Sequence, residues 1–346
     1  MSQSTRLPHP EIIIFDVDGT LVDVTRSYRE TAPAAARIYL ELLGLQPPAL
    51  TGDVYDTFKR MTGFNDDWDL TAGLLRVLLT GLPPAAPLPD EAWGSQDALL
   101  AALRAACQSI AGLTPPLPDW EPLVSAVQAA GGGLAGLGQT IPGRNAHLVW
   151  RTGDAATTDL VQRIFSEVYL GAELFTQAYG CAPRFHSGPG LREHETMLVD
   201  PTTLETLSAH ARLGIATGRA RFEMAPLLAD PSFARFFSAV ATMSDALEVQ
   251  APAGASPGGE SLLKPHPFLL QRAADALDPT GTRVAAYVGD APDDIIAARR
   301  AGAAGPRRWI AIGIASTSAQ AEHYRRLGAD IILAHPDELV TVMNDE

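Results

Sequence analysis

Two aspartates, Asp16 and Asp18, follow an apolar run in the stretch EIIIFDVDGTLVDV (residues 11–24). The run Ile12–Val17 suits a buried strand, whose end is a costly place for carboxylates unless a turn, a metal ion or a substrate compensates them. One aspartate could act as a nucleophile while the other donates and accepts a proton. The alternative is a capped turn in which both carboxylates accept backbone N–H groups. Gly19 permits a tight turn under either interpretation.

Two further segments place phosphate-binding groups after apolar runs. GIATGRA puts Thr217 and Gly218 in a turn, where a hydroxyl and backbone N–H groups can hold phosphoryl oxygens. LLKPHP supplies Lys264, a cation that could neutralise a carboxylate and a phosphoryl group. Lys59 and Lys264 are the two lysines among 26 lysine and arginine residues. In a chain that otherwise uses arginine, a lysine indicates a position where a compact ammonium group is needed.

A cluster of carboxylates follows a fourth apolar run in YVGDAPDDIIAARRAG. Asp290 ends the run, and Asp293 and Asp294 stand at the start of a predicted helix, which they could cap. Placed beside Asp16, these carboxylates would repel one another unless a hard cation lay among them. A ligand set made only of oxygen atoms suits Mg²⁺.

The elements that position these residues form an α/β pattern. Apolar runs that predict buried parallel strands lie at Ile12–Val17, Leu213–Ala216, Ala239–Met243, Val284–Val288, Trp309–Ile314 and Ile331–Leu333. Helical patterns separate several of them, so right-handed crossovers and a three-layer, doubly wound parallel sheet are expected. In such sheets ligands bind at the carboxyl ends of the strands, where the candidate residues stand.

The segment between the first strand and the others has a different character. It contains helical patterns at 27–44 and 157–180, interrupted by Pro- and Gly-rich stretches that include 114–143. We expect residues 24–195 to form an inserted, mostly helical domain, with 1–23 and 196–346 forming the α/β core. A low-complexity stretch at 250–261 is typical of a loop.

The four segments in this order resemble those of the haloacid dehalogenase superfamily of aspartate-nucleophile phosphohydrolases. DVDGTLVD is similar to its first motif, ATGR to its second, KPHP to its third and VGDAPDD to its fourth. The insertion directly after the first motif resembles the helical cap of this superfamily. SYRE, GFNDDWDLT and GLREHETMLVD are similar to segments of a subgroup of subfamily IA hydrolases. The resemblance implies a Rossmann-like core with a cap domain.

The same resemblance implies a role for each core residue. Asp16 would be the nucleophile that forms an aspartyl-phosphate, and Asp18 would be the acid and base. The implied Mg²⁺ ligands are Asp16, the Asp18 backbone carbonyl and Asp290, with Asp294 acting through water. Thr217, Lys264, Gly19 and Gly218 would bind phosphate. An acid at Asp18 argues against dehalogenation, because superfamily dehalogenases generally lack it.

Residues of the predicted insertion could contact the rest of a substrate. Lys59, Asn65, Asp67 and Arg144 are the candidates for specificity. The alternative for Asn65 and Asp67 is a helix N-cap before LTAGLLRVLL, and for Lys59 and Arg144 a solvated surface charge.

Composition limits the partners and the surroundings. The 346 residues carry a net charge of −14, which disfavours nucleic acid. Cys107 and Cys181 lack metal-binding spacing and are expected to be reduced thiols in a cytoplasmic protein, and no apolar stretch predicts a signal peptide or membrane span. We expect a monomer or homodimer.

Three functions compete at this point. The first is a Mg²⁺-dependent phosphatase for a small phosphorylated metabolite. The second is a phosphomutase of the same superfamily, which would have to shield the aspartyl-phosphate from water. The third is a non-catalytic binding module, against which the complete set of carboxylates, threonine and lysine argues.

Overall fold

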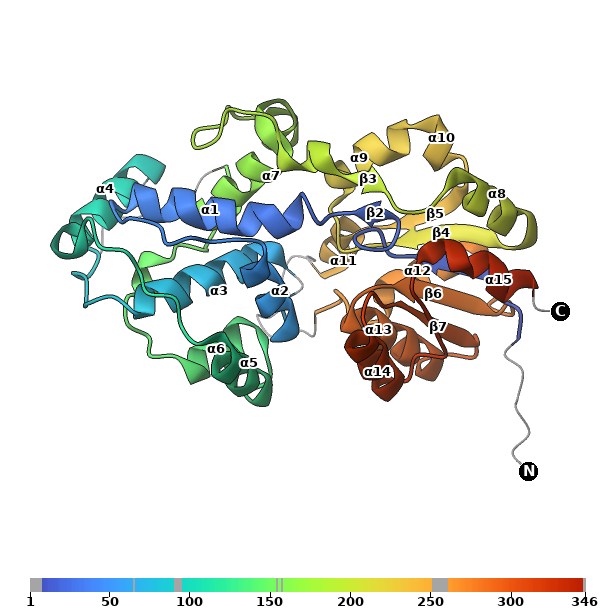
Figure 1. Ribbon diagram of the computed structural model, residues 1–346. Helices are drawn as coiled ribbons and strands as arrows, with labels where there is room; N and C mark the ends of the chain where they lie inside the picture. Colours follow the sequence, from blue (N-terminus) through green and yellow to red (C-terminus); the bar gives the residue numbers. More distant parts are fainter. Residues whose placement is uncertain are drawn as a thin grey trace. The chain divides into compact units, whose positions relative to one another are not determined.

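The computed structural model describes residues 8–64, 66–89, 95–153, 155–156, 158–250 and 261–344. The chain divides into two compact units, which we call the α/β unit and the helical unit (Figure 1). The α/β unit contains the residues up to Asp23 and those from Thr196 onward, and the helical unit contains Val24–Glu195. Residues 251–260, within the stretch expected to be a loop, lie outside the described residues.

Six parallel strands form the main sheet of the α/β unit, in the order β5-β4-β1-β6-β7-β8. They are β1 (Ile12–Phe15), β4 (Arg212–Ala216), β5 (Phe237–Ala241), β6 (Ala285–Gly289), β7 (Trp309–Ile314) and β8 (Ile331–Leu333). Each predicted apolar run overlaps one strand, and the expected α/β fold with a doubly wound parallel sheet is confirmed.

One predicted strand is displaced. The expected run Ala239–Met243 ends early, because Met243 begins the helix α11 (Met243–Gln250). The Asp245 carboxylate accepts hydrogen bonds from the backbone N–H and the hydroxyl of Thr242, both at 2.8 Å. These bonds hold Thr242 between the end of β5 at Ala241 and the start of α11.

Helices cover the sheet and bury its apolar side chains. All four residues of β1 are buried, and Ile12 and Ile14 share a core cluster with residues of α12 (Phe268–Leu277) and α13 (Pro292–Ala303). Because side chains alternate along a strand, Ile13 and Phe15 face the other side of the sheet. The other helices of this unit are α8 (Pro201–His210), α9 (Arg221–Ala229), α10 (Pro231–Ala234), α14 (Ser318–Leu327) and α15 (Leu339–Asn344), with a 3₁₀ turn at Pro336–Glu338.

A two-stranded ribbon, which the sequence did not predict, stands where the chain leaves and re-enters the α/β unit. β2 (Val22–Asp23) pairs antiparallel with β3 (Thr196–Met197). Both strands have only two residues, too short for a periodic signal. The ribbon holds the two chain connections to the helical unit side by side.

The helical unit consists of helices and turns in its described residues. Its helices are α1 (Tyr28–Leu42), α2 (Asp53–Arg60), α3 (Asp67–Thr80), α4 (Gln96–Ala106), α5 (Trp120–Ala129), α6 (Gly133–Thr140) and α7 (Leu160–Tyr179), with 3₁₀ turns at Gln108–Ile110, Ala146–Leu148 and Leu191–His194. α1 packs against α3 and α7, where Tyr28 stacks on Tyr169 with ring centroids 4.2 Å apart. No described helix is both long and apolar enough to cross a membrane.

Glycines shape this unit in two places where the sequence suggested something simpler. α7 is broken at Gly171, whose φ of +74° leaves the helical region. A Cβ there would lie 2.3 Å from the Gly190 backbone nitrogen, so the close approach of two backbones requires glycine. The stretch 114–143 was expected to interrupt the helices, yet it contains α5 and α6.

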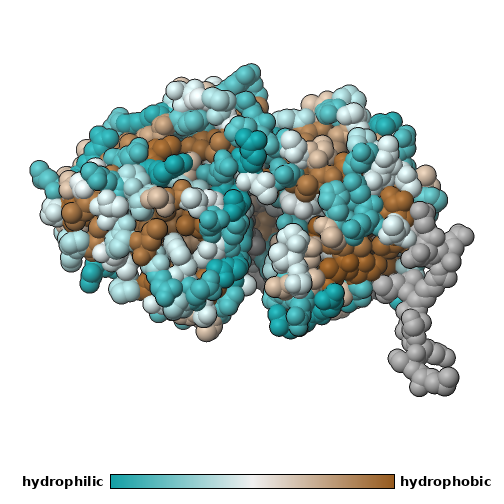
Figure 2. Space-filling model, in the orientation of Figure 1, coloured by the Kyte–Doolittle hydropathy of each residue, from teal (hydrophilic) through white to brown (hydrophobic). Residues whose placement is uncertain are grey.

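The surface mixes polar and apolar side chains. On the face shown in Figure 2, hydrophilic residues are spread over both units, with apolar residues between them.

Candidate functional site

Three predicted site residues follow neighbouring strands of the main sheet. Asp16 follows β1, Thr217 follows β4 and Asp290 follows β6. β1 pairs with β4 on one side and with β6 on the other. The side chains therefore meet at the carboxyl edge of the sheet, where open α/β folds bind ligands.

The turn after β1 is closed by its own backbone. The Val17 carbonyl accepts the N–H groups of Leu21 and Val22, both at 2.9 Å. Gly19 has a φ of +69°, and a Cβ there would lie 2.0 Å from Asp290 Oδ2. Glycine is needed at this position both for the left-handed backbone and for the close approach of the Asp290 carboxylate.

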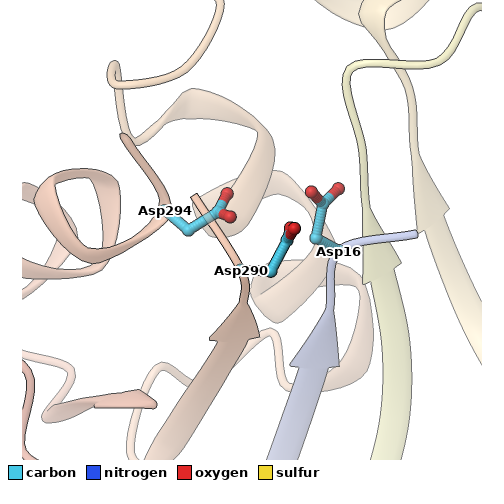
Figure 3. A group of neighbouring side chains, drawn as sticks. All are labelled: Asp16, Asp290 and Asp294. Carbon is cyan, nitrogen blue, oxygen red and sulfur yellow. The ribbon is translucent and has the colours of Figure 1, made fainter. Parts of the chain in front are cut away.

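Asp16, Asp290 and Asp294 form a compact acidic cluster. Asp16 and Asp290 extend from the ends of adjacent strands, and Asp294 turns toward them from the start of α13 (Figure 3). One carboxylate oxygen from each lies within 4.8 Å of the others. Asp16 is 6% exposed and Asp294 is fully buried, so water screens their charges poorly.

Lys264 supplies the positive charge of this cluster. Its ammonium lies 2.9 Å from Asp16 Oδ2, 2.7 Å from Asp294 Oδ1 and 3.2 Å from the Tyr287 hydroxyl. An ammonium has three N–H donors, and these three oxygen atoms can accept them all. The lysine is thereby fixed between the turn after β1, the start of α13 and β6.

Burial changes the protonation equilibria of the cluster. Burial raises the pKa of the Asp16 carboxyl to about 7; Lys264 opposes the rise, and the charges of Asp294 and Asp18 add to it. Burial also raises the pKa of Asp290 well above its usual range, and Asp294 and Asp16 act in the same direction. The pKa of Lys264 is lowered by burial, but Asp16 and Asp294 outweigh this effect and raise it overall.

The donor set fits a hard divalent cation. Among the described residues, Asp16 Oδ1 is buried and has no hydrogen-bond partner, and the Asp290 carboxylate lies beside Asp16 in the same cluster. Buried carboxylate oxygens normally accept hydrogen bonds, so the unpartnered Asp16 Oδ1, in a cluster with two further carboxylates, calls for a cation. Oxygen-only ligands at this spacing suit Mg²⁺.

Asp294 differs from the other two carboxylates because its oxygens are already used. Oδ1 accepts a hydrogen bond from Lys264, and Oδ2 accepts one from the Ala291 N–H at 2.9 Å, which caps α13. A Cβ at Gly289 would lie 2.3 Å from Asp294 Oδ2, so glycine before Asp290 lets the carboxylate fold back. Asp294 therefore positions Lys264 and starts the helix.

Thr217 and Gly218 occupy the turn after β4. The Thr217 hydroxyl accepts the Arg219 N–H at 3.1 Å, which leaves its own proton available to donate. The side chain of Thr217 is fully buried. A Cβ at Gly218 would meet no heavy atom of the described residues within 4 Å, so this backbone is open to a ligand.

Sequence reasoning missed three residues that hold the site together. Arg219 donates two hydrogen bonds to Asp18, at 2.8 and 2.6 Å. The Tyr287 hydroxyl donates to the Ala216 carbonyl at 2.8 Å, and Tyr324 donates to the Asp290 carbonyl. Arg219 stands inside the quoted ATGR segment, whereas the tyrosines gave no signal beyond their places in an apolar strand and a helix.

The structure scatters the specificity candidates over the helical unit. Lys59 Nζ lies 2.8 Å from Asp67 Oδ1 and donates to the Phe64 carbonyl at 3.0 Å. Arg144 is exposed, and its carbonyl accepts the Thr80 hydroxyl at the far end of α3. Asp67 begins this 14-residue helix, so Arg144 stands about 20 Å from the Lys59–Asp67 pair. Asn65 lies outside the described residues.

The N-cap of α3 is Asp66, and it belongs to a second acidic cluster that the sequence did not reveal. Arg151 contacts Asp159, Asp69 at 3.2 Å and Asp66 at 3.4 Å. Its guanidinium also lies 5.5 Å from the centre of the Trp68 ring. This cluster joins the starts of α3 and α7 to the segment before α7.

The structure of this chain was compared with solved structures. Solved structures similar to the chain include a structural-genomics target (TM-score 0.61, 20% identity, 97% of this chain and 98% of that chain). They also include the phosphatase Tt82 from Thermococcus thioreducens (TM-score 0.48, 22% identity, 91% and 98%). The first likeness shows the fold alone.

Sequence comparison supplies the family. No curated protein matches the sequence. A family model described as haloacid dehalogenase-like hydrolase matches residues 10–302, which include Asp16, Thr217, Lys264 and the Asp290–Asp294 segment. The chain belongs to the haloacid dehalogenase-like hydrolase family.

Proposed function

We propose that this protein is a Mg²⁺-dependent phosphatase that hydrolyses a small phosphorylated metabolite through an aspartyl-phosphate on Asp16. The observation that carries the proposal is the state of the Asp16 carboxylate. Oδ2 lies 2.9 Å from Lys264 Nζ, and Oδ1 is buried without a hydrogen-bond partner among the residues that the structure describes. A carboxylate held by one oxygen, with the other oxygen bare, is suited to nucleophilic attack.

In this proposal the reaction has two steps: transfer of the phosphoryl group to Asp16, and hydrolysis of the aspartyl-phosphate. Asp16 forms a bond to phosphorus while the ester P–O bond breaks, and Asp18 gives its proton to the leaving oxygen. Asp18 then takes a proton from a water molecule, whose oxygen attacks phosphorus and displaces the Asp16 carboxylate. Inorganic phosphate leaves, and both aspartates return to their starting states.

Lys264 and Thr217 bind the phosphoryl oxygens in this proposal. Thr217 can donate its hydroxyl proton, and Gly218 lets the phosphoryl group approach the backbone. Lys264 must exchange one of its three present contacts for a phosphoryl oxygen, because an ammonium has three donors. Its contact with Asp16 is the one that the covalent bond would weaken.

The carboxylates of Asp16 and Asp290 and the backbone carbonyl of Asp18 would hold Mg²⁺, with Asp294 acting through water. The bound ion would neutralise the clustered carboxylates and the charge of the transferring phosphoryl group. Among the described residues, Asp16 Oδ1 has no hydrogen-bond partner, and Asp16 lies in one acidic cluster with Asp290 and Asp294, which supports this assignment.

The helical unit acts in this proposal as a subfamily IA cap that selects the leaving group. It is inserted directly after the turn that carries Asp16 and Asp18, and both of its connections leave from the β2–β3 ribbon. A strand-end phosphate site offers few contacts to the remainder of a substrate. Selectivity would therefore depend on residues such as Lys59, Asp67 and Arg144.

Two assays test the proposal. Hydrolysis of an aryl phosphate should require Mg²⁺, stop on chelation and be absent from the Asp16→Asn variant. A panel of phosphorylated metabolites, scored for free phosphate and for isomerised product, then separates hydrolysis from mutase activity. Isomerised product without net phosphate release would indicate a phosphomutase, and no turnover at all would favour a binding module.

A further inference from the structure

Arg219 is a buried arginine beside the residue proposed as the acid and base. Its side chain has no exposed surface, whereas the Asp18 side chain is 31% exposed. Burying a guanidinium is costly unless carboxylates or carbonyls accept its hydrogen bonds. The exposed fraction of Asp18 lets a substrate reach the carboxylate, while the arginine behind it remains out of reach.

The two hydrogen bonds to Asp18 end on the same oxygen. Arg219 Nε lies 2.8 Å and Nη2 lies 2.6 Å from Asp18 Oδ1. Among the described residues, none donates a hydrogen bond to Asp18 Oδ2. Two donors in the rigid plane of a guanidinium fix both the position of Oδ1 and the rotation of the carboxylate.

The backbone of Arg219 is fixed as well. Its N–H donates to the Thr217 hydroxyl at 3.1 Å, and its carbonyl accepts the Met243 N–H at 3.0 Å. The residue thus links the turn after β4, which holds Thr217, to the turn after β1, which holds Asp18. Arg219 and Asp18 are 201 positions apart in the chain.

We infer that Arg219 is a positioning residue that holds Asp18 Oδ1, so that Asp18 exchanges its proton through Oδ2. A carboxylic acid whose Oδ1 accepts two N–H bonds carries its proton on the other oxygen. Oδ2 then gives that proton to the leaving oxygen and later receives one from water. The inference rests on the proposed function, because it assigns a partner to the proposed acid and base.

The test compares two phosphate esters that differ in their need for a proton. A nitrophenyl phosphate has a leaving oxygen that departs readily without one, whereas an alkyl phosphate depends on general acid catalysis. We expect Arg219→Gln to lower kcat/KM for the alkyl ester about 100-fold and for the aryl ester about tenfold or less. Arg219→Lys retains the positive charge but lacks the planar guanidinium. Its kcat/KM for the alkyl ester should lie between the values of Arg219→Gln and of the native protein.

Two controls isolate the role of the Asp18 contact. Arg221→Gln removes a nearby arginine that pairs with Glu248 at 2.7 Å on the surface, and it should leave both esters within about twofold. In an Asp18→Asn background, Arg219→Gln should not change the alkyl-to-aryl ratio further, because the group that it positions is gone. Thermal unfolding of every variant shows whether the fold is retained.

Several results would overturn the inference. Equal losses on both esters, or an additional change of ratio in the Asp18→Asn background, would assign Arg219 a structural role. Failure of both Arg219→Gln and Arg219→Lys to fold would have the same meaning. If the native protein hydrolysed neither ester, the proposed function itself would fail. That outcome differs from an active native protein whose alkyl-to-aryl ratio of kcat/KM does not change when Arg219 is substituted.

Discussion

The α/β unit and the helical unit each hold three aspartates beside one basic side chain. In the α/β unit they are Asp16, Asp290 and Asp294 near Lys264, and in the helical unit they are Asp66, Asp69 and Asp159 around Arg151. Burial raises the pKa of Asp16 and Asp290, and it also raises the pKa of each aspartate in the helical cluster. A raised pKa therefore does not distinguish a reactive cluster from a structural one.

The hydrogen bonds do distinguish them. In the helical unit, Asp66 accepts the Trp68 N–H at 2.8 Å as the N-cap of α3, and Asp159 accepts the Gln162 N–H at 2.8 Å as the N-cap of α7. In the α/β unit, Asp16 Oδ1 is buried and has no hydrogen-bond partner in the described part of the chain. Carboxylates with structural roles are satisfied by their surroundings, and an unsatisfied buried oxygen marks where a ligand or ion is expected.

The largest effect should follow from Asp16→Asn. We expect kcat for an aryl phosphate to fall at least about 10³-fold, because an amide cannot form the covalent intermediate. Thermal unfolding should show a folded protein, since the amide keeps the volume of the side chain. Turnover near the native value would contradict the proposed nucleophile.

In the helical cluster the effect should be on stability. Asp159→Asn leaves Arg151 without its fully buried partner, and we expect the free energy of unfolding to fall by about 2–3 kcal/mol. Asp97→Asn is the matched surface control: Asp97 pairs with Arg184 but is 81% exposed, so its loss should cost less than about 0.5 kcal/mol. Denaturant titration measures both, and a large loss of aryl phosphatase activity in Asp159→Asn would break the distinction between the clusters.

The pH dependence of stability should reveal the buried Asp16. Its pKa is about 7 in the folded protein and 3.8 when unperturbed, so between these pH values the folded state binds more protons than the unfolded state. Raising the pH through this window should therefore lower the free energy of unfolding, with a slope of at most about 1.4 kcal/mol per pH unit for one proton. Unfolding in the presence of a chelator measures the slope, which Asp16→Asn should reduce. An unchanged slope in that variant would assign the titration to another group.

A smaller effect is expected at Tyr287. Tyr287→Phe removes the hydroxyl that donates to the Ala216 carbonyl and lies 3.2 Å from Lys264 Nζ. Loss of one neutral hydrogen-bonding group should lower kcat about 3- to 10-fold, because Lys264 loses one of its three acceptors. Steady-state kinetics test this expectation, and an unchanged kcat would show that Asp16 and Asp294 hold the lysine without help.

The smallest effect should come from Lys59→Met. The pair with Asp67 is partly exposed, so we expect less than about 1 kcal/mol of lost stability and nearly native hydrolysis of a minimal aryl ester. The relative kcat/KM values for larger phosphorylated metabolites should change, if the helical unit selects the leaving group. Arg144→Met, about 20 Å away along α3, provides the comparison. Unchanged selectivity in both variants would count against these residues as specificity determinants.

The sequence was most informative where local pattern and function coincide. Asp16, Thr217 and Asp290 were predicted at strand ends because each follows an apolar run of strand length. The contact between Arg219 and Asp18 could not be predicted, because 201 positions separate the partners and no periodicity links them. Long-range ion pairs depend on how elements pack, which local patterns do not contain.

In the helical unit, too, local sequence patterns were not enough to predict the structure. The Gly-rich segment around Gly132 predicts an interruption between helices, yet a Cβ at Gly132 would lie 2.7 Å from the Thr62 carbonyl oxygen. The glycines allow α6 to begin against the Thr62–Gly63 turn, where the Gly133 N–H bonds the Thr62 carbonyl at 2.9 Å. Glycine that serves packing and glycine that breaks a helix look alike in the sequence.

If Asp16 carries the phosphoryl group during turnover, the covalent intermediate can be trapped on this residue. The native protein and the Asp18→Asn variant would be mixed with a phosphorylated substrate and Mg²⁺, quenched in acid within milliseconds and reduced with borohydride. Borohydride converts an aspartyl-phosphate to homoserine, which peptide mass spectrometry can locate. We predict homoserine at position 16, with none in the Asp16→Asn variant. Homoserine at another aspartate, or turnover of the native protein without any trapped residue, would contradict an aspartyl-phosphate on Asp16.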